Sequence, residues 1–197
     1  CLDAKGASHI SALFPFGVEG TTDWLRSAAK EFGVSESLFN QVITPKRDRA
    51  IHALAKHRDQ LEGKKIFFFP DSQLEIPLAR FLHQECGMQL TEIGTPYLHK
   101  AHLAHELERL PNHVRIAEGQ NVEKQIDRMH EAKPDLVVCG LGLANPLEAQ
   151  GLTTKWAIEL VFSPIHGYDQ AADLAELFAR PIRRKEKLTF KVDELCN

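Results

Sequence analysis

The strongest candidates for chemistry lie where buried strands should end. Residues 136–139 read LVVC and suit a strand covered on both faces, and Gly140 then lets the backbone turn tightly. In open α/β sheets, ligand contacts gather just past such carboxyl ends. Asp71 follows the apolar run 66–69 in the same way. It is therefore a candidate proton donor or ligand contact, although a turn-forming aspartate has the same sequence signature.

The segment after Gly140 is too apolar for an ordinary surface loop. Its apolar side chains are Leu141, Leu143, Leu147, Leu152, Trp156, Ile158, Leu160, Val161, Phe162 and Ile165. They predict a subunit interface, a pocket for a large apolar ligand, or both. Glu148 and Lys155 flank the run, where they could form an ion pair, contact a ligand's carboxylate or lie on a solvated rim. Trp156 could form an aromatic wall against a flat ring or pack in the core.

Three further patterns give weaker signals for chemistry. The string GLGLAN resembles a dinucleotide fingerprint, but it follows the last predicted strand, has Asn145 in the third glycine position and precedes Pro146. His99, His102 and His105 share a three-residue spacing, yet their directions drift by about 60° per step around a helix. A solvated helix face is therefore favoured over a metal site. No spacing of Ser, Cys, His and Asp indicates nucleophilic catalysis.

The cysteines also argue against a local metal or disulfide framework. Cys1, Cys86, Cys139 and Cys196 lie far apart and form no CxxC pair. Cys139 falls in the apolar strand, where a small buried hydrophobe is its expected role.

Composition predicts a globular protein with a sizeable core. The chain has 197 residues, 43% hydrophobic and 26% charged, and its net charge of −3 gives no reason to expect a nucleic-acid partner. No apolar stretch approaches the roughly 20 residues that a membrane span needs, and no leader opens the chain, so we expect a soluble intracellular protein. Because the chain starts at Cys1, we also expect a piece of a longer product that lacks an N-terminal part.

The order of elements predicts an α/β fold with a doubly wound, mainly parallel sheet. A helical lead-in over 21–61 is followed by strands at 64–69, 89–93, 114–117 and 135–139, with helices at 78–86, 101–110 and 122–131 between them. Four strands divided by three helices imply parallel crossovers.

We expect three regions along the chain. Residues 1–62 form the helical lead-in, part of a preceding domain, residues 63–180 form the parallel α/β domain, and residues 181–197 form a basic C-terminal tail. Within that tail, the alternation over 188–192 predicts a short edge strand or docking arm after a last helix at 169–178.

The first helix of the α/β domain has two possible starts. Ser72 and Glu75 fit a capping box, whereas Pro77 lacks the amide hydrogen that an interior turn needs. We predict a single turn at Ser72 and a helix that restarts at Pro77.

Four long strings are specific enough to indicate a family. They are PFGVEGTTDWL (15–25), FFFPDSQLEIPLARFL (67–82), GTPYLH (94–99) and CGLGLANPLEAQGLTTKWAIELVFSPIHGY (139–168). In this order they resemble the N subunits of light-independent protochlorophyllide reductase, a nitrogenase-like family. The resemblance covers nearly the whole chain up to about residue 184.

The resemblance implies a multi-subunit reductase. N and B subunits form an N2B2 heterotetramer, and a separate L subunit, an ATP-Mg-binding iron-sulfur protein, docks transiently and delivers electrons from ferredoxin. The reaction reduces the ring D double bond of protochlorophyllide and gives chlorophyllide a. It takes place in the bacterial cytoplasm or the plastid stroma.

The same resemblance limits what this chain can contribute. The family's N subunit supplies three cysteines to a 4Fe-4S cluster, all in its N-terminal region, and none of them matches a cysteine here. The chain therefore resembles the C-terminal part of the subunit and should be unable to hold the cluster or turn over alone. Proton donation in the family comes from the substrate and the B subunit. Asp71, Glu148, Lys155 and Trp156 thus remain substrate-pocket or interface candidates by position.

Two other interpretations stay open. One is another nitrogenase-like subunit, such as part of chlorophyllide a reductase or a cofactor-assembly scaffold. The other is a non-catalytic Rossmann-like module whose apolar run only docks a partner.

Overall fold

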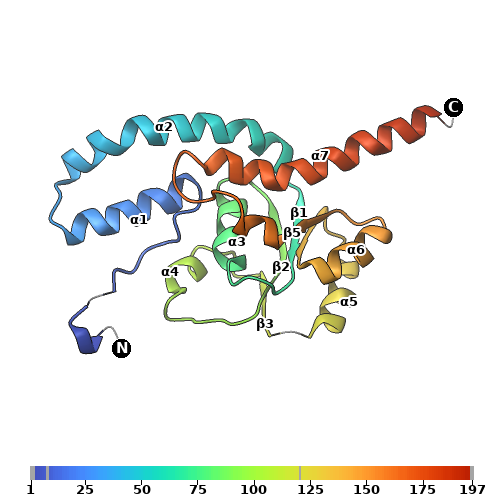
Figure 1. Ribbon diagram of the computed structural model, residues 1–197, viewed down its shortest axis with the longest axis horizontal. Coiled ribbons are helices and arrows are strands. Elements are labelled where there is room, and N and C mark those ends of the chain that lie inside the picture. Colours follow the sequence, from blue (N-terminus) through green and yellow to red (C-terminus); the bar gives the residue numbers. More distant parts are fainter. Residues whose placement is uncertain (1–2, 8, 120, 196–197) are drawn as a thin grey trace.

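A five-stranded parallel sheet forms the centre of the molecule (Figure 1). The computed structural model describes residues 3–7, 9–119 and 121–195. The strands are β1 (Lys65–Phe68), β2 (Gln89–Thr95), β3 (Arg115–Glu118), β4 (Leu136–Cys139) and β5 (Thr154–Trp156). Their order is β3-β2-β1-β4-β5, and every neighbouring pair is parallel. The predicted α/β class, the parallel sheet and the first four strands are confirmed.

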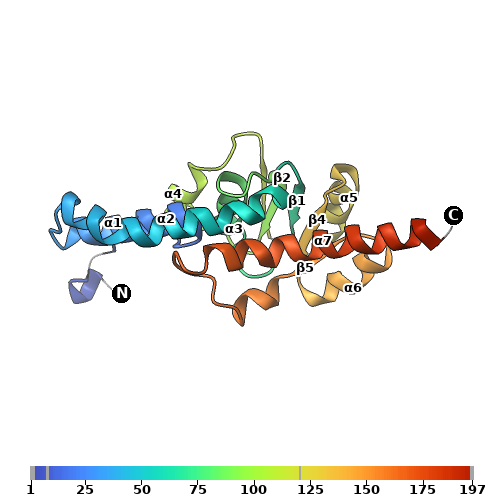
Figure 2. The same ribbon diagram turned by 90° about the horizontal axis from the view of Figure 1, so that it is seen from above.

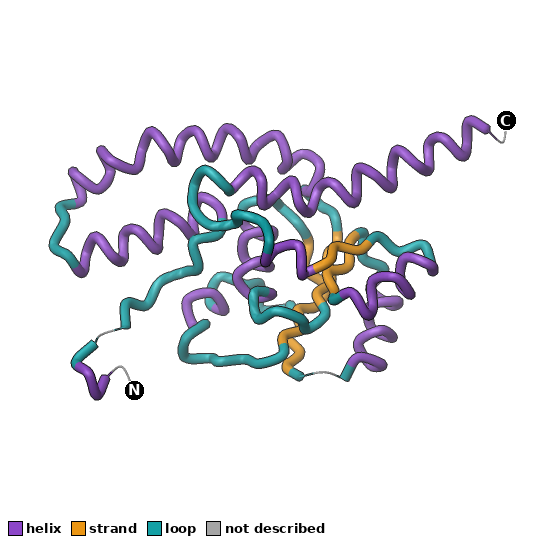
Figure 3. The backbone as a smooth tube through the Cα atoms, viewed as in Figure 1, coloured by secondary structure: helices purple, strands orange, loops and turns teal. Residues whose placement is uncertain are grey.

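The described part of the chain also contains seven α-helices and two 3-10 turns (Figure 3). The α-helices are α1 (Gly17–Glu31), α2 (Glu36–Leu61), α3 (Glu75–Gln84), α4 (Ala104–Leu107), α5 (Val122–Ala132), α6 (Leu141–Ala149) and α7 (Ala171–Leu195). The 3-10 turns are η1 (Asp3–Lys5) and η2 (Ala157–Val161). The helical lead-in is therefore confirmed as the pair α1 and α2, which packs beside α7 (Figure 2).

Alternation along the strands divides the core between the two faces of the sheet. Ile66, Phe68 and Val138 belong to a large cluster with residues of α1, α2, α3 and α7. Phe67 and Val137 belong to a smaller cluster with residues of α5 and α6. Because successive side chains of a strand point to opposite faces, helices cover both sides, as in a doubly wound sheet.

Buried charges attach the helical lead-in to the α/β part. Arg80 on α3 is fully buried, and its Nε donates to Glu106 at 2.8 Å. Its Nη2 donates to the carbonyl oxygens of Phe14 and Phe16, and its Nη1 donates to Glu85 at 3.2 Å. An arginine with five donors can satisfy several acceptors at once, which lets one side chain hold the segment before α1 against α3.

Helix α3 begins two residues earlier than predicted. It starts at Glu75 instead of Pro77, and the Glu75 carboxylate accepts hydrogen bonds from the backbone N–H of Ser72 at 2.6 Å and from its hydroxyl at 3.2 Å. Pro77 therefore lies in the first turn, where a helix needs no amide donor.

Two other expectations need correction, and one strand was not predicted. The helix predicted at 101–110 is reduced to the single turn α4, with turns on either side. Strand β5 was not predicted, because three residues that include a lysine give no periodic signal. The short strand predicted at 188–192 is wrong, because α7 continues through Pro181 to Leu195. Arginine and lysine are good helix formers, so the basic run extends the buried first half of the helix.

Candidate functional site

The topological switch point of the sheet lies between β1 and β4. After β1 the chain builds β2 and β3 on one side and then returns to place β4 and β5 on the other. In such sheets the loops after the two central strands diverge, and ligands bind in the crevice that they leave. Asp71 follows β1 and Gly140 follows β4, so the structure places both at this point.

Asp71 lies directly against the turn after β4. A Cβ atom built on Gly140 would approach the Asp71 Oδ1 to 2.5 Å, so a larger residue at this position would displace the Asp71 side chain. Asp71 and Gly140, which follow two different strands in the sequence, therefore lie in contact in the fold.

The loop that carries Asp71 is held in a strained shape. Gln73 has a φ of 68°, in the left-handed region that residues other than glycine rarely adopt. Glu75 is buried, and its Oε1 accepts from the N–H groups of Asp71 at 2.9 Å and Ser72 at 2.6 Å. Backbone strain of this kind persists only where the surroundings enforce it, and it is concentrated at ligand sites.

Large apolar side chains are exposed just after β4 and β5. We call Leu141, Ile158, Val161 and Phe162 the apolar edge; they are 52%, 39%, 66% and 81% exposed. Leu141 opens α6, and the other three follow β5 through η2. Exposed apolar groups on the ligand-facing side of a sheet are typical of a surface that contacts another molecule.

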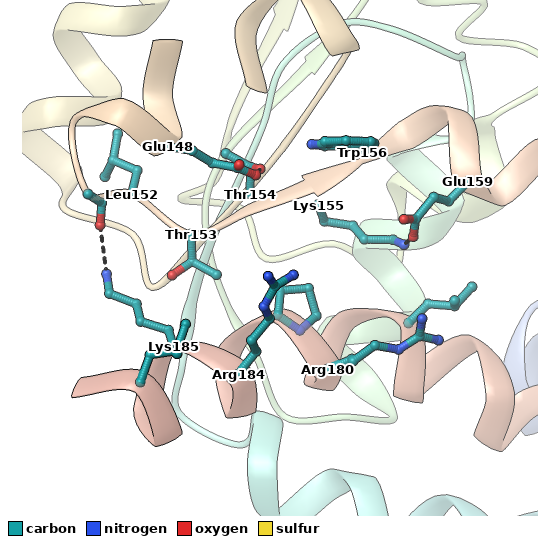
Figure 4. A pocket seen from close by; sticks show the side chains of 14 residues that line it. Glu148, Leu152, Thr153, Thr154, Lys155, Trp156, Glu159, Arg180, Arg184 and Lys185 are labelled. Carbon is teal, nitrogen blue, oxygen red and sulfur yellow. Dashed lines mark hydrogen bonds and ion pairs between the residues drawn. The ribbon is translucent and has the colours of Figure 1, made fainter. Parts of the chain in front are cut away.

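A separate pocket of about 500 Å³ lies between β5 and α7 (Figure 4). We call it the side pocket. It is lined by Glu148, Gly151, Leu152, Thr153, Thr154, Lys155, Trp156, Glu159, Leu177, Arg180, Pro181, Arg184, Lys185 and Leu188. Three of the four candidate residues from the sequence, Glu148, Lys155 and Trp156, meet here, whereas Asp71 does not.

Glu148 and Lys155 do not form an ion pair with each other, because each has another partner. The Lys155 ammonium pairs with the carboxylate of Glu159, four residues later in η2, and the Thr154 hydroxyl donates to Glu148. Burial, together with the nearby Arg180, lowers the pKa of Lys155 to about 8. Glu159 and Arg180 were not predicted from the sequence, because Lys155 lies in a strand and no helical spacing links it to either residue.

The described cysteines and histidines do not form a metal centre. Cys86 and Cys139 are free and buried, and burial raises the pKa of both thiols, that of Cys139 to about 12. His99 and His102 stack with ring centroids 3.9 Å apart in the turn before α4, so the expected regular helix face is absent. In the described ranges, no group of three or more His, Cys, Asp or Glu residues could hold a metal ion. Cys1 and Cys196 lie outside those ranges.

No helix in the described part of the chain is both long enough and apolar enough to cross a lipid bilayer.

Family comparison accounts for almost the whole chain. Residues 2–183 match the model of the family described as nitrogenase component 1 type oxidoreductase. The chain belongs to this family. Two solved structures with the same fold are both called nitrogenase Cp1, one at pH 5 and one at pH 6.5. Their TM-scores are 0.68 and 0.70, with 14% and 13% identity over 85% and 86% of this chain and 40% and 43% of theirs.

Within the nitrogenase component 1 type oxidoreductases, much higher identity is found with one kind of protein. Light-independent protochlorophyllide reductase subunit N of Rhodospirillum rubrum is 65% identical over 95% of this chain and 43% of its own length. The subunit of the same name in Rubrivivax gelatinosus is 62% identical over 95% of this chain and 44% of its own. The resemblance predicted from the four sequence strings is thereby confirmed. The chain spans less than half the length of these relatives.

Proposed function

We propose that this chain is part of an N-type subunit of light-independent protochlorophyllide reductase. The observation that carries the proposal is the 65% identity to a subunit of that name over 95% of this chain. On this proposal, the complete assembly reduces the ring D double bond of protochlorophyllide. It contains a B subunit in an N2B2 heterotetramer, it receives electrons from ferredoxin through an ATP-Mg-binding L subunit, and it works in the bacterial cytoplasm or the plastid stroma.

Within that assembly, we assign the apolar edge to the wall of the tetrapyrrole site. A tetrapyrrole is large, flat and mostly apolar, and such ligands bind against aliphatic and aromatic side chains. Phe162 is 81% exposed and Val161 is 66% exposed, so both are available for this contact. Asp71 lies at the neighbouring switch point, where it could contact polar substituents of the ring.

The 4Fe-4S cluster of such a reductase does not fit the residues described in this chain. Iron-sulfur clusters need thiolates, and the two described cysteines are buried with raised pKa values. No step of the reaction is therefore assigned to a cluster bound here. We propose that other parts of the assembly hold it, and that this chain shapes the substrate site.

A chimeric subunit tests the proposal. The matching region of the Rhodospirillum rubrum subunit N is replaced by this chain, and the complex is assembled with that organism's B and L subunits. We expect reduction of protochlorophyllide in the dark, followed by absorbance and dependent on ATP and a reductant. A correctly assembled chimera that fails to reduce protochlorophyllide, or that reduces chlorophyllide a in its place, would contradict the proposal.

A further inference from the structure

The side pocket has the form of a small-molecule site. Its volume of about 500 Å³ lies within the range of roughly 300–1,000 Å³ that such sites occupy. Leu152 and Trp156 line it from the β5 side, while Leu177, Pro181 and Leu188 line it from α7. The pocket therefore offers apolar walls on two sides of one opening.

Cations outnumber anions in its lining. The charged residues are Lys155, Arg180, Arg184 and Lys185 against Glu148 and Glu159. Both carboxylates already have partners, since Glu159 pairs with Lys155 and Glu148 accepts from Thr154. The excess positive charge comes from α7, so an anion in the pocket would meet complementary charge.

Two of the three arginines of α7, Arg180 and Arg184, remain available for a ligand. Arg180 has one ion pair, with Glu176 outside the pocket lining, at the long distance of 4.0 Å. Arg184 is exposed and has no hydrogen bond or ion pair with the described residues, and Figure 4 shows it extending from α7 toward β5. A guanidinium can bind a carboxylate or phosphate with two parallel hydrogen bonds.

A buried hydroxyl in the same lining also has no partner. Thr153 is 8% exposed, and its Oγ1 has no hydrogen-bond partner among the described residues. Buried polar atoms are normally hydrogen-bonded, because leaving one unsatisfied costs free energy. A ligand polar group within hydrogen-bond distance of this hydroxyl would satisfy it.

We propose that the side pocket binds a small organic anion. Its carboxylate or phosphate lies between Arg180 and Arg184, and its apolar body lies against Leu152, Trp156 and Leu177. The site is separate from the switch point between β1 and β4, and the inference does not rest on the proposed reductase function.

Binding is tested with phenyl phosphate on the 197-residue chain by ¹H–¹⁵N correlation spectra. We expect saturable shifts of amide signals from residues 152–156 and 177–188. Inorganic phosphate carries only the anion and benzyl alcohol carries only the ring, so each should bind about tenfold more weakly than phenyl phosphate. Phenylacetate tests whether a carboxylate can replace the phosphate group. Binding should also weaken with added salt.

Charge-removing variants decide whether the arginines are responsible. We expect Arg184→Gln and Arg180→Gln each to weaken phenyl phosphate binding by about fivefold or more. Lys187→Gln removes a charge from the same helix outside the pocket lining and should leave binding unchanged. All three side chains are exposed, so the variants should fold, and their spectra show this directly. Absent or unsaturable shifts, or equal binding by all three variants, would overturn the inference.

Discussion

At the scale of single residues, Glu85 is a buried carboxyl group whose ionisation affects stability. Its carboxylate accepts from the Val18 N–H at 2.5 Å and from Arg80 at 3.2 Å, at the junction between α1 and α3. Burial nevertheless dominates and raises the pKa of Glu85 to about 7, from an ordinary value of 4.5. Because Arg80 also has Glu106 as a partner, the junction retains one ion pair when Glu85 is protonated.

This raised pKa predicts how stability depends on pH. Between about pH 4.5 and 7 the folded protein binds a proton that the unfolded chain has lost, so stability falls as pH rises through this window. Ionisation of Glu85 should therefore lower the free energy of unfolding by up to about 3 kcal/mol by pH 8. We expect Glu85→Gln to remove most of this slope in urea unfolding at pH 5 and pH 8. An unchanged slope in the variant would show that Glu85 is already ionised at pH 5.

Single residues also differ in whether their position in the fold could be predicted from the sequence. Asp71 was predictable as an edge residue, because it lies two residues after an apolar run and strand ends share one edge of a parallel sheet. Arg80 was not predictable as a buried residue. Two of its partners, Glu106 and Phe14, lie 26 and 66 positions away in the chain, and only the tertiary fold brings them to Arg80.

At the scale of elements, the start of α1 depends on one glycine. Gly17 has a φ of 70°, and a Cβ atom there would lie 2.5 Å from both carboxylate oxygens of Glu85. The turn at Gly33 between α1 and α2 has a similar φ of 68°, but a Cβ atom there would meet nothing within 4 Å. The two positions share backbone strain and differ in packing.

We therefore expect Gly17→Ala to destabilise the protein by about 3 kcal/mol or more, the sum of backbone strain and overpacking. Gly33→Ala should cost only about 1–2 kcal/mol, because it introduces the strain alone. Chemical denaturation at one pH measures the loss of stability in both variants. Equal losses of stability would mean that α1 does not pack tightly on Glu85.

Elements were predictable where a local run or spacing of apolar residues marked them. The first four strands and helices α1, α2, α3 and α5 follow regular apolar patterns. Strand β5 and the continuous helix α7 were not predictable, because β5 has only three residues and the alternation over 188–192 also fits a helix. The side pocket lies between these two elements, so it could not be seen in the sequence, although three of its lining residues were.

At the scale of the whole molecule, several features that favour contact with another molecule lie at the carboxyl edge of the sheet. The chain spans less than half the length of its relatives. The apolar edge leaves Phe162 81% exposed, and the strained loop at Gln73 and the topological switch point also follow strands of this sheet. These features come from three different segments, and only the order of the strands brings them to one side of the sheet.

The central claim, that this edge faces the tetrapyrrole, is tested most directly by the kinetics of the chimeric complex. Phe162→Ser is compared with Phe32→Ser, a matched change at a phenylalanine that is 78% exposed between α1 and α2, and size-exclusion chromatography checks assembly. We predict that kcat/KM for protochlorophyllide falls by about tenfold or more in assembled Phe162→Ser and is unchanged in Phe32→Ser. Wild-type kcat/KM in assembled Phe162→Ser would contradict the account.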